Sequence, residues 1–214
     1  MPAASPLASG RVADVYALGA DRVIRRCRDG GDVRVEAELM AYLRAQGYPV
    51  PEVFRADGPD LEMTRLAGPT LAEALVTGVV DIRSGARILA TLHDRLHALP
   101  TRTSPDPTAR VLHLDLHPEN VMVTAEGPVV IDWGNAGEGP PELDVAMTAL
   151  IVAEVATDPT SPFVALAGDL LTAFLAEAGP VRLLDGAVGL RARTGPLDAR
   201  RLAQAAARVR TAHG

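Results

Sequence analysis

Short runs of apolar residues alternating with polar ones fill the first third of the chain and predict a small sheet. Turn-forming Gly, Pro and Asp residues separate the runs in pairs, as in two hairpins. The four expected strands are residues 11–18, 22–27, 53–56 and 61–64. Between the hairpins, residues 33–45 have helical spacing that places Val35, Leu39 and Leu43 on one apolar face. The pattern therefore predicts an antiparallel sheet with one helix.

The rest of the chain is mostly helical in pattern. Within residues 70–99, five positions share one face at helical spacing: Ile82, Ala86, Leu89, His93 and Leu96. A strongly apolar helix is expected from Glu142, and further helices are expected over 162–178 and 183–210, broken at the Gly-Pro pairs 179–180 and 195–196. A single histidine on an apolar helix face is usually a structural residue, and we interpret His93 in this way.

Composition narrows the class of protein. Hydrophobic residues make up 48% of the 214 residues and charged residues 22%, which is ordinary for a soluble globular protein. A single cysteine, Cys27, excludes an internal disulfide and fits a reducing cytoplasm. The N-terminus lacks the pattern of a signal peptide, and the most apolar window, 145–156, is too short to span a bilayer. The net charge of −6 argues against nucleic acid and suits a cationic partner.

Candidate chemistry is concentrated in residues 111–134. His113, Asp115 and Asn120 form an H-x-D-x-x-x-x-N segment, and Asp132 opens a D-x-G segment twelve residues after Asn120. Two strand-like runs and a Glu-Gly-Pro turn lie between them, so a hairpin returns the chain close to where it left. We therefore expect Asp115, Asn120 and Asp132 to converge.

A hydrolase-type metal site is the alternative for the same segment. His113, Asp115 and His117 alternate, so a strand would direct all three to one face. Pro118 argues against such a strand, and this interpretation leaves Asn120 and Asp132 without a role.

The segment resembles the kinase-like phosphotransferases of small molecules, the aminoglycoside phosphotransferase and choline kinase family. Further matches are E-x-x-x-M-x-x-L from Glu36, followed by Pro49-Val50-Pro51, and Asp144-Val145-Ala146. The chain departs from the family at Leu114, where glycine is usual. The resemblance implies an α+β, two-lobed protein kinase-like fold, with an N-lobe over residues 1–65 and a mostly helical C-lobe over 66–214.

The resemblance also implies roles for the residues of the motif. Asp115 would be the catalytic base that receives the proton of the acceptor hydroxyl, and Asn120 and Asp132 would hold Mg²⁺. His117 would be either a neighbour of the acceptor or phosphate, or a loop residue packed beside Pro118. Asp144 would accept backbone N–H groups of the catalytic loop and would be structural.

The phosphate-binding cation is the second departure from the family. Relatives carry Lys at the end of the second strand, whereas this chain has Arg25, which we expect to bind the nucleotide phosphates and to pair with Glu36. Glu38 is the alternative partner, although it points about 200° away on the helix. Arg26 is the alternative cation, and strand alternation would place it on the opposite face.

The nucleotide base would be bound where the lobes join. Met63, Arg65 and Leu66 occupy the segment that resembles the hinge of kinases, in which backbone groups contact adenine. Met63 would lie behind the adenine, although an ordinary core methionine explains it equally well.

Together these features predict a phosphotransferase that moves the γ-phosphoryl group of ATP or GTP to a hydroxyl of a small molecule. Two alternatives remain: a catalytically silent nucleotide-binding module in which Arg25 marks loss of function, and a kinase of a macromolecular acceptor. The intact set of Asp115, Asn120 and Asp132 argues against the first alternative, and the net acidity argues against the second.

Overall fold

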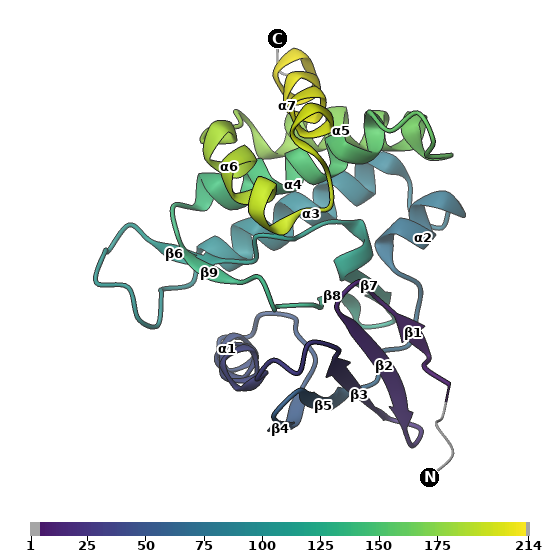
Figure 1. Ribbon diagram of the computed structural model, residues 1–214, viewed down its shortest axis with the longest axis vertical. Coiled ribbons are helices and arrows are strands. Elements are labelled where there is room, and N and C mark those ends of the chain that lie inside the picture. Colours follow the sequence, from purple (N-terminus) through teal and green to yellow (C-terminus); the bar gives the residue numbers. More distant parts are fainter. Residues whose placement is uncertain (1–4, 213–214) are drawn as a thin grey trace. The chain divides into compact units, whose positions relative to one another are not determined.

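The computed structural model describes residues 5–212, so the outermost residues of both predicted lobes lie outside it (Figure 1). Its α-helices and antiparallel strands form an α+β fold, as predicted. Packing contacts divide the chain into two units. Unit 1 contains the chain up to Gly68 together with Met122–Gly134, and unit 2 contains Pro69–Val121 together with the chain from Asn135.

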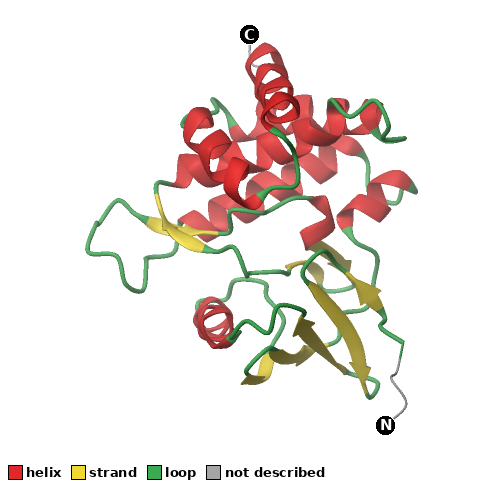
Figure 2. Ribbon diagram, viewed as in Figure 1, coloured by secondary structure: helices red, strands yellow, loops and turns green. Residues whose placement is uncertain are grey.

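Unit 1 is built on a five-stranded antiparallel sheet with the strand order β1-β2-β3-β5-β4, drawn among the yellow arrows of Figure 2. The strands are β1 (Ala8–Ser9), β2 (Ala13–Leu18), β3 (Arg22–Cys27), β4 (Val53–Asp57) and β5 (Asp60–Thr64). The four predicted strands are β2 to β5. Strand β3 is central, and its Arg25 is opposite Val15 of β2 and Leu61 of β5.

Helix α1 (Arg34–Ala45) forms where predicted but buries a different face. Its buried residues are Ala37, Met40 and Leu43, whereas Val35 is 78% exposed. The expectation that Val35 belongs to the inner face was therefore wrong. The helix is rotated so that Glu36, next to the buried Ala37, reaches the sheet, because its carboxylate pairs with Arg25.

The hairpin of β7 (Val121–Thr124) and β8 (Gly127–Val130) groups largely with unit 1, although the predicted boundary at residue 65 placed it in the second lobe. The backbone N–H of Val130 donates to the carbonyl oxygen of Pro49 at 2.9 Å. The buried rings of Tyr48 and Trp133 pack edge to face, with centroids 5.7 Å apart. Gly68 has φ 130°, and a Cβ there would lie 2.1 Å from the carbonyl oxygen of Val123, so only glycine fits.

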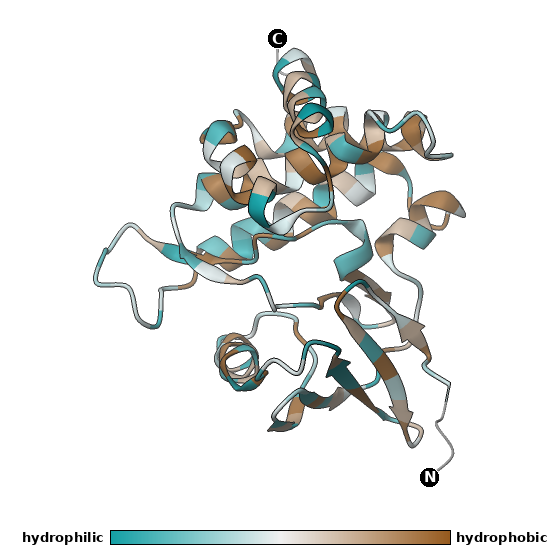
Figure 3. Cartoon of the chain, in the orientation of Figure 1, coloured by the Kyte–Doolittle hydropathy of each residue, from teal (hydrophilic) through white to brown (hydrophobic). Residues whose placement is uncertain are grey.

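Unit 2 is mostly helical. Its helices are α2 (Leu71–Val76), α3 (Ile82–His97), α4 (Pro141–Ala156), α5 (Val164–Ala178), α6 (Leu184–Thr194) and α7 (Ala199–Ala212). Helix α4 packs against α3, α5, α6 and α7 and is buried almost all round. Figure 3 shows its apolar residues in brown. The predicted inner face of α3 is confirmed, since Ala86, Leu89, His93 and Leu96 are buried.

A short strand pair precedes α4. Strand β6 (Arg110–Leu112) pairs antiparallel with β9 (Gly137–Gly139). The carboxylate of Glu138 in β9 accepts the backbone N–H groups of Arg102, Thr103 and Ser104. The strand thus fixes the turn-rich segment that leads to the catalytic loop.

Among the described residues, no helix is both long and apolar enough to cross a membrane.

Candidate active site

The buried carboxylate of Asp144, near the start of α4, anchors the predicted catalytic loop. Asp144 Oδ2 accepts the backbone N–H of His113 at 2.9 Å, and Oδ1 accepts that of Leu114 at 2.7 Å. The expectation that Asp144 is structural is confirmed by these bonds. They fix the backbone of the loop immediately before Asp115.

Leu114 occupies a position that favours glycine. Its φ is 61°, in the left-handed region, which costs an L-residue about 1–2 kcal/mol. A glycine would adopt this conformation without that cost. In this chain the bond from the Leu114 backbone N–H to Asp144 Oδ1 holds a leucine there.

Two histidines of α3 complete the support of the loop. His97 Nε2 lies 3.1 Å from Asp144 Oδ2. His93 Nε2 lies 2.8 Å from the hydroxyl of Thr148, which itself donates to the carbonyl oxygen of Leu116. His93 Nδ1 lies 3.6 Å from Asp144 Oδ2, too far for a hydrogen bond, and has no such partner among the described residues.

The cluster of His93, His97 and Asp144 has metal-ligating atoms within 4.8 Å of one another. Both carboxylate oxygens already accept backbone N–H groups, so the cluster fits a structural role better than a metal site. Burial alone would raise the pKa of the Asp144 carboxyl, but the imidazoles of His93 and His97 hold it far below its usual range.

Acid should therefore weaken unit 2. A depressed pKa in the folded state contributes stability that is fully present above the unfolded value of about 3.9 and is lost as the pH falls below it. Asp144→Asn leaves a backbone N–H without its acceptor and should cost about 1–3 kcal/mol at pH 7. Urea unfolding followed by helical circular dichroism should show this difference shrinking as the pH falls below about 4, the unfolded pKa of the carboxyl. An equal difference at all pH values would contradict the assignment.

Asp115 and Asn120 are brought together in unit 2, and both are buried. Asn120 Nδ2 donates to the backbone carbonyl oxygen of Asp115 at 2.9 Å and lies 3.3 Å from His117 Nε2. The amide nitrogen is thus used within the loop, which leaves Oδ1 as an oxygen ligand suited to Mg²⁺. His117 Nε2 is also 3.9 Å from Asp115 Oδ1, so His117 lies beside both residues.

The side chain of Asp115 has two further partners that sequence reasoning missed. Oδ1 is 3.1 Å from Arg191 Nη1 in α6, and Oδ2 is 3.3 Å from Asn135 Nδ2. Arg191 is also bound by Glu154 of α4. One signal was available, because Glu154 is a charge inside the most apolar window of the chain, but its partner lies 37 residues away in a segment without a motif.

The candidate phosphate cation is held in unit 1 as expected. Arg25 Nη2 pairs with Glu36 Oε2, and Arg25 Nη1 is 3.7 Å from Asp132 Oδ1. Glu36 Oε1 also accepts the backbone N–H of Trp133 at 3.2 Å. Burial raises the pKa of the Glu36 carboxyl, Arg25 opposes this, and Asp132 adds to it. A buried cation thus lies beside an Asp132 side chain that is 39% exposed.

Arg26, the alternative phosphate-binding cation, pairs with a different carboxylate. Arg26 makes two hydrogen bonds of 2.6 Å to Asp60, and its side chain is 56% exposed. Glu38 is exposed on α1 and does not pair with Arg25. Geometry therefore favours Arg25 and Glu36, the pair that the family pattern implied, over Arg26 and Glu38.

The expected hinge residues lie near the end of the first segment of unit 1, which closes at Gly68. Met63 is half-buried in β5, opposite Val23 of the central strand. The backbone N–H of Arg65 donates to the carbonyl oxygen of Asp21 at 2.8 Å, so it is already used within unit 1. Leu66 is half-buried just before the end of the unit at Gly68. Their contact with a nucleotide base stays a prediction.

Asp132 belongs to unit 1, whereas Asp115 and Asn120 belong to unit 2. The convergence of all three residues likewise stays a prediction.

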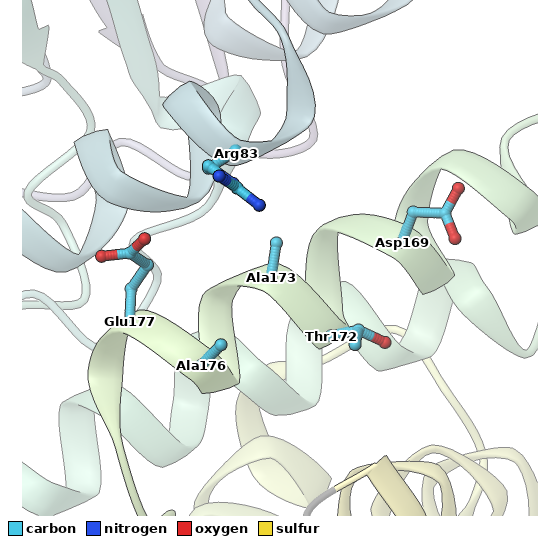
Figure 4. Close-up of a pocket in the computed structure, with 6 residues that line it drawn as sticks. All are labelled: Arg83, Asp169, Thr172, Ala173, Ala176 and Glu177. Atoms are coloured by element: carbon cyan, nitrogen blue, oxygen red, sulfur yellow. The ribbon is translucent and has the colours of Figure 1, made fainter.

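A separate open pocket of about 300 Å³ lies beside α3 and α5. It is lined by Arg83, Asp169, Thr172, Ala173, Ala176 and Glu177 (Figure 4). Its lining includes none of the predicted site residues, and the Ala side chains offer a ligand little to bind.

Comparison with known proteins now identifies the family. The model of the phosphotransferase enzyme family matches residues 3–110 and 85–184, which is most of the chain. The chain belongs to this family. A search of curated proteins finds no match.

Solved structures show the same fold for this phosphotransferase. The gentamicin complex of APH(2″)-IIa has a TM-score of 0.60 at 14% identity, over 95% of this chain and 89% of that one. An aminoglycoside-3′-phosphotransferase of type VIII has a TM-score of 0.56 at 20% identity, over 98% and 92%. A choline/ethanolamine kinase family protein from Mesorhizobium loti has a TM-score of 0.57 at 18% identity, over 97% and 86%. The predicted family and kinase-like fold are confirmed.

Proposed function

We propose that this phosphotransferase moves the γ-phosphoryl group of ATP or GTP to a hydroxyl group of a small molecule. The observation that carries the proposal is the cluster of Arg25, Glu36 and Asp132 in unit 1. A fixed guanidinium suits phosphate oxygens, and a partly exposed carboxylate beside it suits the cation that accompanies them.

Each residue then has one task. Arg25, oriented by Glu36, binds phosphate oxygens. Asp132 and the amide oxygen of Asn120 would hold Mg²⁺, which when bound neutralises charge on the transferred group. Asp115 orients the acceptor hydroxyl and takes its proton while the oxygen–phosphorus bond forms.

The neighbours support a nucleotide donor and a small acceptor. They include an amicoumacin kinase in complex with AMP-PNP and an aminoglycoside 2′-phosphotransferase in complex with GDP. The names of other neighbours point to aminoglycosides, choline and ethanolamine as acceptors. A cationic alcohol is our preferred acceptor class, because the chain carries a net charge of −6.

The direct test is incubation with Mg-ATP or Mg-GTP and a panel of aminoglycosides, amino alcohols and sugars. We expect an acceptor whose mass rises by one phosphoryl group, with Asp115→Asn as the inactive control. Nucleotide binding without transfer to any acceptor or to water would favour the silent module. Transfer only to a protein or RNA would favour the macromolecular acceptor.

Arg25→Ala should sharply weaken nucleotide binding or turnover, because Arg25 is the buried cation of the cluster. Arg25→Lys should keep substantial activity, since Lys is usual in the family, although it lacks the guanidinium fork. Glu36→Ala should be milder and non-additive with Arg25→Ala, because both changes break one pair. Calorimetric titration with Mg-ATP measures each effect.

Arg26→Ala is the matched control for Arg25→Ala. It removes the neighbouring guanidinium of the same strand, whose exposed pair with Asp60 lies on the other face. A nearly silent Arg25→Ala together with a damaging Arg26→Ala would reverse the assignment.

A further inference from the structure

Arg191 joins two acidic side chains inside unit 2. Its Nε and Nη2 atoms each donate to a different oxygen of Glu154 at 2.9 Å, and its Nη1 atom donates to Asp115 Oδ1 at 3.1 Å. All three residues are buried, and Arg191 is 7% exposed. A guanidinium that remains charged thus lies between the predicted catalytic base and a second carboxylate.

The geometry of the guanidinium makes the contact with Asp115 directional. Two parallel bonds to Glu154 fix the plane of the group, because its N–H donors form a rigid fork. Once the plane is fixed, the direction of Nη1 is fixed as well, and it points at Asp115 Oδ1. A pair that only joined α4 to α6 would need the Glu154 contacts alone. The third bond, from Nη1, instead holds Asp115, the predicted catalytic base.

The two oxygens of Asp115 are therefore unlike. Oδ1 faces the Arg191 cation, whereas Oδ2 has a longer contact of 3.3 Å with the neutral amide of Asn135. Oδ1 is thus occupied by the charged Nη1 donor, which leaves Oδ2 as the oxygen available to the acceptor hydroxyl.

We propose that Arg191, oriented by Glu154, is a positioning residue that fixes Asp115 so that Oδ2 receives the proton of the acceptor hydroxyl. This inference rests on the proposed phosphotransferase function. As the acceptor oxygen bonds to phosphorus and the bond to the nucleoside diphosphate breaks, the hydroxyl proton moves to Oδ2. Arg191 stays bound to Oδ1 throughout and exchanges no proton.

The main test is the double variant Arg191→Met/Glu154→Met. Replacing both partners by apolar residues avoids leaving a buried charge of the pair unmatched, so folding should be preserved. We expect kcat to fall about 10- to 100-fold, as for a misplaced catalytic group, with KM for the nucleotide unchanged. Arg191→Lys should recover part of kcat, since one ammonium cannot reproduce all three bonds.

A double-mutant cycle separates positioning from simple structural support. If Arg191 acts through Asp115, the double variant Arg191→Met/Glu154→Met should have little further effect on kcat in an Asp115→Asn background. If the double variant lowers kcat by the same factor in both backgrounds, Arg191 does not act through Asp115 and the inference is overturned.

Two glycine substitutions test the geometry without removing any charge. A Cβ at Gly195, the residue after α6, would lie 2.8 Å from both Arg191 Nε and the Arg191 carbonyl oxygen, so Gly195→Ala should displace the guanidinium together with the end of the helix and lower kcat. A Cβ at Gly189, in the same helix, would meet nothing within 4 Å, so Gly189→Ala should leave kcat unchanged.

The controls also separate this inference from the function on which it rests. Arg210→Met breaks an exposed pair with Asp185 of α6 and should leave kcat unchanged. If the parent transfers phosphate and the folded Arg191→Met/Glu154→Met variant has the same kcat, the role of Arg191 is overturned. The proposed function would then still stand. Absence of turnover by the parent, on every acceptor and on water, would overturn the proposed function and this inference with it.

Discussion

Asp115→Asn is expected to lower the rate of phosphoryl transfer by about 10²–10⁴-fold while Mg-ATP still binds as tightly as to the parent. The amide keeps the size of the side chain and can still accept a hydrogen bond from Arg191, so the loop should keep its structure. It cannot take the proton of the acceptor hydroxyl at neutral pH. The effect should therefore fall on kcat.

Single-turnover kinetics measure the chemical step, and calorimetric titration measures nucleotide binding. The charge-preserving variant Asp115→Glu is a useful companion, because it keeps a carboxylate but displaces it from Arg191 and Asn135. Near-parental turnover of Asp115→Asn would remove this residue from the mechanism. A matching loss of nucleotide affinity would mean that Asp115 acts on the donor instead.

Asp132→Ala should have the second large effect, this time on nucleotide binding itself. The variant removes a carboxylate that would hold Mg²⁺, and it leaves Arg25 paired with Glu36. We expect Mg²⁺ to strengthen ATP binding to the parent and to have little effect on the variant. Removal of Mg²⁺ from the parent by a chelator should reproduce the affinity of the variant.

Asp60→Ala provides the matched control for Asp132→Ala. Asp60 also lies in unit 1 beside an arginine, but it is the first residue of β5 and its pair with Arg26 is exposed. Its loss should leave the Mg²⁺ dependence of ATP binding intact. Equal affinity and equal Mg²⁺ dependence of Asp132→Ala and the parent would exclude Asp132 as a metal ligand.

The sequence predicted those features that depend on local pattern or on strand alternation. Strands β2 to β5 follow alternating residues. The two faces of β3 separate Arg25 from Arg26, and the family pattern selected Arg25. The anchoring of the loop by Asp144 followed from the family motif and is seen in the bonds to His113 and Leu114.

Features that depend on tertiary contacts could not be predicted from the sequence. Helix α1 buries Ala37, Met40 and Leu43 and pairs Glu36 with Arg25 of the sheet, which leaves Val35 exposed. The bonds of Arg191 to Glu154 and Asp115 join residues far apart in sequence, and no periodicity marks them. Strand β9 contains only Gly137–Gly139, whose composition predicts a loop.

The grouping of Met122–Gly134 with unit 1 has a consequence for biosynthesis. The first unit cannot complete its core when residue 68 leaves the ribosome, because Tyr48 still lacks the ring of Trp133. More than fifty further residues must be made first, so unit 1 should fold late in translation. Trp133 is the single tryptophan of the chain and is buried, so its fluorescence is a built-in signal of that event. Nascent chains should therefore acquire buried-tryptophan emission as soon as residue 134 has emerged, before the last helices of unit 2 have left the ribosome.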